Sequence, residues 1–105
     1  EKTVKTGKAA LHIEETNAVT AIDVDSGGVR KMTKNQTHFE VNLMAIDEIA
    51  KQLRLRNIGG MIIVDFLRVD EKERQTLFAQ MKKKENTDKR LKVAGFTKLG
   101  LFEMQ

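Results

Sequence analysis

Three aspartates follow apolar or alternating segments, where their carboxylates can do chemistry. Asp23 and Asp25 are two residues apart, so both side chains emerge on one face of a predicted strand. Asp65 follows the apolar run Met61 to Val64, where a carboxylate is costly unless it is paired or binds a metal. Carboxylates without cysteine or clustered histidine favour a hard cation such as Mg²⁺. Water and phosphate on its open positions would support metal-assisted phosphodiester hydrolysis.

Two of these aspartates also have a structural interpretation. Asp25 begins an Asp-Ser-Gly sequence, which is typical of a turn, so Asp25 alone is better explained as a turn residue. Asp65 has an ordinary alternative in a buried salt bridge to Arg54 or Arg68. The combination of carboxylates for a metal with cations for phosphates favours the phosphodiester site over these alternatives.

The composition excludes several classes of protein. The chain has 105 residues, of which 40% are hydrophobic and 32% charged, which suits one compact domain. It has no cysteine, so disulfide scaffolds, thiol catalysis and cysteine-ligated zinc are excluded. The longest apolar stretches are far shorter than the roughly 20 residues that span a bilayer. We therefore expect a cytoplasmic protein without a membrane segment, and the first residue, Glu1, predicts a piece of a longer protein.

Positive charge is concentrated in the second half of the chain. Residues 1–52 hold 7 Lys and Arg against 8 Asp and Glu, whereas residues 53–105 hold 12 against 7. Polyanion binding and a solvated helix face explain this surplus about equally well. The candidate contacts with an RNA backbone, chosen by charge, are Arg30, Lys31, Lys82, Lys83 and Lys84. His12 and His38 lack a third partner for a metal or a nucleophile and are expected to be surface or packing residues.

The first quarter of the chain predicts a hairpin. Residues 1–10 are polar and without period, and we expect a flexible terminus ahead of a single domain over residues 11–105. Alternation from Leu11 predicts a short strand, followed by a two-residue turn at Thr16-Asn17. A second alternating strand then extends from Val19 to Asp25.

The middle of the chain predicts a helix and a central strand. Residues 29–40 show no period and are expected to be a loop. Asn42 is a good N-cap for the helix that follows, which Gly59-Gly60 ends. The segment Met61 to Leu67 is apolar on both faces, which predicts a strand covered on both sides.

The last third of the chain predicts a second helix and the closing strands. Asp70 and Glu73 have capping-box spacing and begin the helix. Residues 91–104 predict one or two strands with a turn near Gly95 or Gly100. The expected fold is α/β, a single mixed sheet with two main helices in the order β-β-α-β-α-β(-β). If the strands joined by the first helix are parallel neighbours, Asp23 and Asp25 lie beside Asp65 at one sheet edge.

Five segments of this sequence closely resemble the bacterial ribonuclease E/G family. The resemblance covers about residues 11–104 in the same order and with similar spacing. The segments are Ala21–Gly27 (AIDVDSG), Asn42–Leu43, Asp47–Gly60 (DEIAKQLRLRNIGG), Ile62–Phe66 (IIVDF) and Phe96–Met104 (FTKLGLFEM). The resemblance implies the catalytic, DNase I-like subdomain of an endoribonuclease that cuts single-stranded RNA.

The resemblance also implies roles for the three aspartates. The family residues that match Asp23 and Asp65 bind the catalytic Mg²⁺, and Mn²⁺ is a possible substitute. The position of Asp25 is usually Asn and helps to orient water or another ligand at the metal; an Asp there puts that geometry in doubt. Hydrolysis would leave a 5′-phosphate and a 3′-hydroxyl.

The resemblance implies partners beyond this chain. We expect three further parts of the family in a full-length protein: the OB-fold RNA-binding region, the 5′-end-sensing region and the cysteine pair of the inter-subunit zinc link. The full-length protein could then form a homo-oligomer. The isolated chain is therefore expected to have feeble activity. The alternative hypothesis is a non-catalytic RNA-binding or assembly module that keeps the fold, with a purely structural subdomain as a third.

Overall fold

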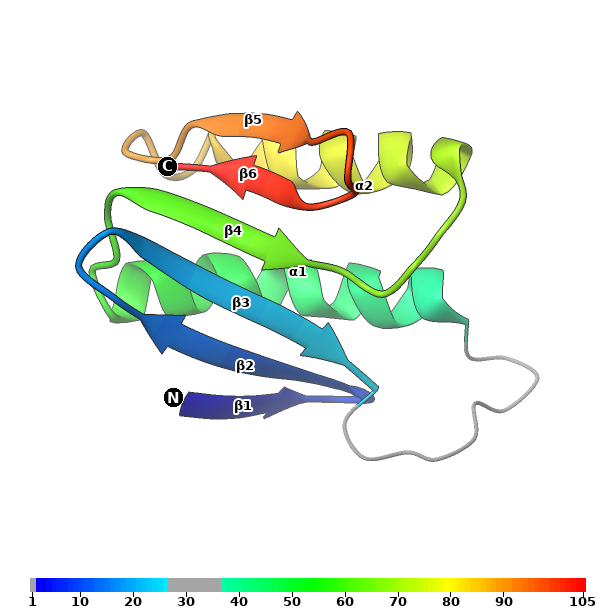
Figure 1. Ribbon diagram of the computed structural model, residues 1–105, viewed down its shortest axis with the longest axis horizontal. Helices are drawn as coiled ribbons and strands as arrows, with labels where there is room; N and C mark the ends of the chain where they lie inside the picture. Colours follow the sequence, from blue (N-terminus) through cyan, green and yellow to red (C-terminus); the bar gives the residue numbers. More distant parts are fainter. Residues whose placement is uncertain (1, 27–36) are drawn as a thin grey trace.

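Six strands form one mixed sheet in the computed structural model, which describes residues 2–26 and 37–105. The order across the sheet is β1-β2-β3-β4-β6-β5, in which β3 and β4 are parallel and the other neighbours antiparallel. The predicted α/β fold with a single mixed sheet is confirmed (Figure 1). The strands are β1 (Lys2–Thr6), β2 (Ala9–Glu15), β3 (Val19–Asp25), β4 (Met61–Asp65), β5 (Val93–Phe96) and β6 (Phe102–Met104).

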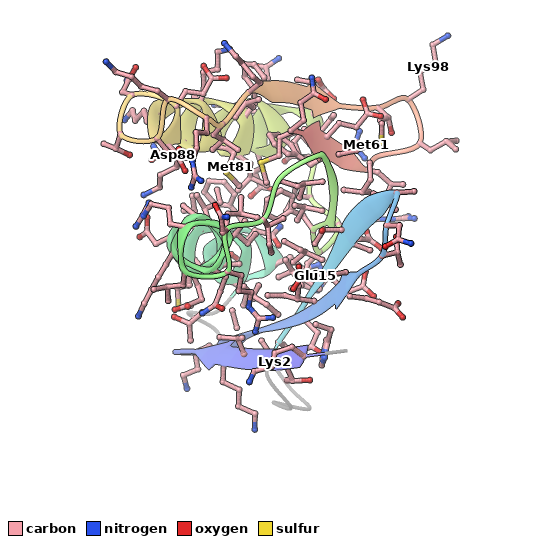
Figure 2. All side chains as sticks on the ribbon, turned by 90° about the vertical axis from the view of Figure 1, so that its left-hand side faces the viewer. Lys2, Glu15, Met61, Met81, Asp88 and Lys98 are labelled. Atoms are coloured by element: carbon pink, nitrogen blue, oxygen red, sulfur yellow. The ribbon has the colours of Figure 1, made fainter. Side chains whose placement is uncertain are left out.

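Two helices, α1 (His38–Leu55) and α2 (Glu71–Lys84), cover the same face of the sheet. A side view shows both helices on one side of the strands (Figure 2). The longer helix contacts β1, β2 and β3, α2 contacts β5, and the two helices contact each other. The core lies between these layers and includes Leu11, Ile22, Val64 and Phe102, each 1% exposed or less. No helix of the described residues covers the opposite face, which we call the open face. None of the described helices is long and apolar enough to cross a bilayer.

The central strand β4 differs from its prediction. Ile62 and Val64 are buried, but Met61 on the open face is 49% exposed and Ile63 is only partly buried. The prediction that this run is covered on both sides is therefore wrong. Both helices lie on the other side of the sheet, and Ile63 is paired with Glu103 of β6 on the open face.

The amino-terminal residues form a strand, so the prediction of a flexible terminus is wrong for Lys2–Thr6. This strand pairs antiparallel with β2, and Val4 packs against the core. The pairing of Thr6 with Ala9 leaves Gly7 and Lys8 as a two-residue hairpin loop. Gly7 has φ 57°, the left-handed conformation that such a tight loop requires.

The first helix begins earlier than predicted, at His38 rather than after Asn42. Thr37 is the N-cap, because its side-chain oxygen accepts a hydrogen bond from the backbone N–H of Glu40 at 3.2 Å. The predicted loop 29–40 is therefore wrong for residues 38–40, and residues 29–36 lie outside the described part of the chain. Asn42 is a fully buried residue of α1.

The carboxy-terminal third agrees with its prediction. Asp70 and Glu73 form a capping box at the start of α2. The closing segment forms β5 and β6, and the turn between them includes Gly100 at φ 92°. The Phe102 ring packs edge-on against Phe66 and Phe96, at 5.7 and 5.0 Å between ring centroids. This aromatic cluster fixes the end of the sheet next to the last residue of β4.

Candidate functional site

The parallel pairing of β3 with β4 places Asp23 directly beside Asp65. Their Cα atoms are register partners, so both side chains emerge on the open face of the sheet, and both are exposed. Register partners on neighbouring strands lie about 5 Å apart along the hydrogen-bonding direction. The prediction that these two carboxylates lie together at the carboxyl edge of the strands is confirmed.

The environment of Asp65 differs from the one predicted. Its side chain is exposed on the open face, so the expected desolvation of a carboxylate inside an apolar run does not occur. Among the described residues it forms no ion pair with Arg54 or Arg68. The structural alternative of a buried salt bridge is therefore wrong, and this carboxylate remains accessible to a ligand.

Asp25, the last residue of β3, is bonded to a histidine. Its carboxylate is 46% exposed and accepts a hydrogen bond from His12 Nε2, with which it forms an ion pair when the imidazole is protonated. The other ring nitrogen of His12, Nδ1, lies 3.1 Å from the hydroxyl oxygen of Thr3. A cation on the imidazole would partly balance the negative charge that three aspartates bring to this edge.

His12 is the site residue that the sequence did not predict. It pairs with Asp23 across β2 and β3, and Thr3 pairs with it from β1, so one row of the open face reads Thr3, His12, Asp23 and Asp65 across four strands. A two-residue turn at Thr16-Asn17 would have placed His12 opposite another residue. In the structure Glu15 pairs with Thr20, so residues 16–19 lie between the paired positions, two more than in such a turn, and His12 pairs with Asp23.

The start of α1 holds the segment that follows Asp65. The buried side chain of Asn42 accepts a hydrogen bond from the Leu67 N–H and donates one to the Leu67 carbonyl, each 2.9 Å long. One turn earlier, His38 Nδ1 donates to the carbonyl of Arg68 at 2.9 Å. His38 is exposed and is thus the surface residue expected. These bonds tie α1 to the end of β4 and fix where Asp65 and Arg68 lie.

A shallow cavity of about 430 Å³ lies over the carboxylates. Its lining combines acidic, imidazole and guanidinium groups, which suits a ligand that carries both a cation and an anion. The residues that line it include His12, Asp23, Asp25, Asp65, Leu67 and Arg68.

The donor set fits a cation for which water or substrate supplies most of the ligands. In the described residues no group of three or more acidic, histidine or cysteine side chains is arranged to enclose a metal ion. Asp23 and Asp65 offer carboxylate oxygens on one face. Mg²⁺ is usually held by one or two carboxylates together with waters and phosphate oxygens, which is compatible with this pair.

The structure does not bring the predicted lysines to this cavity. Lys82, Lys83 and Lys84 form the last turn of α2, and this helix starts beyond the end of β4 and extends back along the sheet (Figure 1). Its 14 residues span about 20 Å. Lys82 pairs with Glu85 and Lys84 with Asp47.

Arg30 and Lys31, the other two candidate RNA contacts, lie outside the described residues. An RNA-binding role for all five basic residues stays a prediction. Arg68, which the sequence suggested only as a salt-bridge partner, is the cation that lines the carboxylate cavity.

Comparison with known proteins gives one consistent result. Residues 2–105 match the model of the ribonuclease E/G family. The chain is 43% identical over 95 residues to ribonuclease E of Synechocystis sp., covering 88% of this chain and 14% of that protein. It is 38% identical over 97 residues to ribonuclease G of Escherichia coli K12, covering 90% of this chain and 20% of that protein.

The match is nearly complete for this chain and partial for its relatives. Ribonuclease G of Haemophilus influenzae is 40% identical over 97 residues, again 90% of this chain and 20% of the relative. The chain thus spans between about one seventh and one fifth of the length of these relatives. With the fold and the paired aspartates described above, the full-length family match shows that this chain belongs to the ribonuclease E/G family.

Proposed function

We propose that this chain is the metal-binding catalytic part of an endoribonuclease that hydrolyses single-stranded RNA. The observation that carries the proposal is the register of Asp23 with Asp65 on the open face of the sheet. Support comes from the family match and from relatives named ribonuclease E and ribonuclease G. Regions outside the matched stretch, as present in such relatives, would bind the RNA.

Asp23 and Asp65 would hold Mg²⁺, or Mn²⁺ in its place, through one carboxylate each. When bound, the cation supplies Lewis acidity toward a phosphate oxygen and lowers the pKa of a neighbouring water. Asp25, oriented by His12, lies two residues from Asp23 on the same face and would orient a water at the site. Arg68 lines the same cavity and would neutralise charge on the phosphate.

The reaction is hydrolysis, in which the attacking oxygen of water and the departing 3′ oxygen lie in line with the phosphorus. The oxygen of water forms a bond to phosphorus, the bond from phosphorus to the 3′ oxygen breaks, and a proton reaches the departing 3′ oxygen. The products are a 5′-phosphate and a 3′-hydroxyl. Both carboxylates are exposed on the open face, which leaves room for the RNA strand to lie across them.

The metal site is tested on the 105-residue chain by amide NMR during titration with Mg²⁺. We expect shifts clustered around Asp23, Asp25 and Asp65 that disappear in Asp65→Asn. The matched control is Asp47→Asn, which removes a carboxylate from the exposed surface of α1. Equal shifts in Asp65→Asn and in the control would contradict a metal site on this pair.

Cleavage is tested in a chimera, because the isolated chain is expected to have feeble activity. This chain replaces the matching 97-residue stretch of Escherichia coli ribonuclease G. We expect Asp23→Asn or Asp65→Asn to lower cleavage at least about 100-fold, the scale of losing one charge-stabilising group. A folded chimera that binds RNA without cleaving it, or that ignores both aspartates, would favour the non-catalytic RNA-binding module instead.

A further inference from the structure

A second cavity shares a wall with the carboxylate cavity. Its volume is about 120 Å³. Asp65 and Arg68 line both cavities, so the two cavities are neighbours on the surface. The remainder of the second cavity includes Arg74, Phe96, Leu99 and Gly100.

The guanidinium of Arg74 lies over the ring of Phe96 and close to Gly100. Its guanidinium carbon lies 5.2 Å from the centroid of the Phe96 ring, the geometry of a cation–π contact. A Cβ atom at Gly100 would lie only 2.7 Å from Arg74 Nη2, so the guanidinium occupies space that a larger residue would fill. Gly100 also has φ 92°, which other residues rarely adopt.

The two arginines carry positive charge without an acidic partner. Neither Arg68 nor Arg74 forms an ion pair with a carboxylate of the described residues. A planar guanidinium that is already oriented binds phosphate oxygens through two parallel hydrogen bonds and loses little side-chain freedom in doing so. Leu99, 92% exposed, adds an apolar surface at the rim. The cavity therefore suits a phosphodiester group more than an apolar ligand.

We propose that Arg74, oriented by Phe96, forms with Arg68 a subsite for the phosphate next to the cleaved one in single-stranded RNA. The proposal rests on the proposed function for the position of the cleaved phosphate. The site aligns the RNA strand so that one phosphate lies over Asp23 and Asp65 while Arg74 holds its neighbour, and Arg68, which lines both cavities, contacts both phosphates. Arg74 is in this sense a substrate-positioning residue on α2, a helix that contributes none of the aspartates.

The experiment measures RNA affinity without catalysis. A fluorescent single-stranded oligouridylate is titrated with the 105-residue chain in buffer that contains a chelator. Its fluorescence anisotropy reports binding over a series of salt concentrations. Arg74→Gln is expected to lower the slope of log affinity against log salt by about 0.7, the value for one phosphate contact on a single strand. The same slope corresponds to about a 5-fold loss of affinity at 0.1 M salt. Arg74→Lys keeps the charge and is expected to keep the slope, with an intermediate loss of affinity.

The control removes one positive charge from another surface. Lys51→Gln lies on an exposed position of α1, on the side away from the open face, and is expected to leave the slope unchanged. Equal slopes for wild type and Arg74→Gln, or equal effects of Arg74→Gln and Lys51→Gln, would overturn the subsite.

A second measurement keeps the proposal testable if Arg74→Gln unfolds the chain. RNA is expected to shift the amide signals of Phe96 and Gly100 in the wild type, and absence of these shifts would overturn the subsite. The binding assay contains no metal, so its outcome does not depend on cleavage. A wild-type chain that shows no metal response in the magnesium titration would contradict the metal site, whereas a salt slope that Arg74→Gln leaves unchanged would contradict the subsite, so the failures of the two proposals are distinguishable.

Discussion

The two faces of the sheet are built from the same strands and have opposite tasks. The covered face buries apolar side chains such as Ile22, Val64 and Phe102 under the helices. The open face carries the row that includes His12, Asp23 and Asp65. Because side chains alternate, each aspartate stands next to a core residue in the sequence. The carboxylates therefore need no burial, and the core that positions them contains no charge.

The largest expected effect on stability comes from the covered face. Phe102→Ala removes a fully buried ring that packs against Phe66 and Phe96. We expect a loss of about 3–5 kcal/mol in the free energy of unfolding, from lost burial and the cavity that remains. Urea denaturation measures it, and Phe102→Leu should lose clearly less. A loss below about 1 kcal/mol would mean that this face does not form the principal core.

The next largest effect on stability is expected where α1 is bonded to the segment that follows β4. Asn42→Leu leaves the N–H and the carbonyl of Leu67 without the two hydrogen bonds that Asn42 supplies. We expect a loss of about 2–4 kcal/mol, because each unpaired buried group costs about 1–3 kcal/mol. Gln52→Leu, on the same helix and half-buried, is the control and should cost less. Equal losses from the two variants in urea denaturation would contradict a clamp at Asn42.

The open face should contribute little to stability. Asp23→Asn and Asp65→Asn keep the shape of the side chains and remove one of two neighbouring negative charges. Without added metal we expect changes within about 0.5 kcal/mol, in the stabilising direction, as for other exposed positions. We expect the same variants to abolish the proposed metal response, so urea denaturation with and without Mg²⁺ separates the two roles. Marked destabilisation in the absence of metal would show that the carboxylates are structural.

The smallest effect is expected at Glu85, outside both faces. Its carboxylate accepts the backbone N–H of Val93, which lowers its pKa below the ordinary 4.5, and Lys82 adds to the shift. Because the folded pKa is the lower one, this contribution is complete above pH 4.5 and is lost as the pH falls through the folded value. Glu85→Gln should therefore lose stability above pH 4.5 and flatten the decline in acid.

Urea midpoints on both sides of that pH test the expectation for Glu85. Glu14→Gln, an exposed carboxylate on β2, is the control. Parallel pH profiles for wild type and Glu85→Gln would contradict the role assigned to the hydrogen bond from Val93.

The central features of the site could be predicted because they depend on local patterns. Alternation over Val19–Asp25 indicates which side chains of β3 share a face. A helix between two strands favours a parallel crossover, which places Asp23 beside Asp65. The capping box at Asp70 and Glu73 is likewise a local signal with one physical meaning.

The errors concern relations between distant residues. The apolar run of β4 does not reveal that both helices pack on one side of it, since periodicity reports burial only through the final packing. The partner of His12 depends on the length of one loop, and two additional residues there shift the pairing. Asn42 has the chemistry of a helix cap, yet it lies within α1, where its buried side chain is hydrogen-bonded to Leu67.

The parallel pairing of β3 and β4 also governs the order in which the molecule is assembled. The β2–β3 hairpin closes a short loop, whereas β4 can join β3 only when the crossover through α1 is in place. A chain that has formed the hairpin alone presents Asp23 without Asp65. The proposed binding of a cation by both carboxylates would thus be possible only in the completed fold, and such a cation would stabilise that state over every partly folded one.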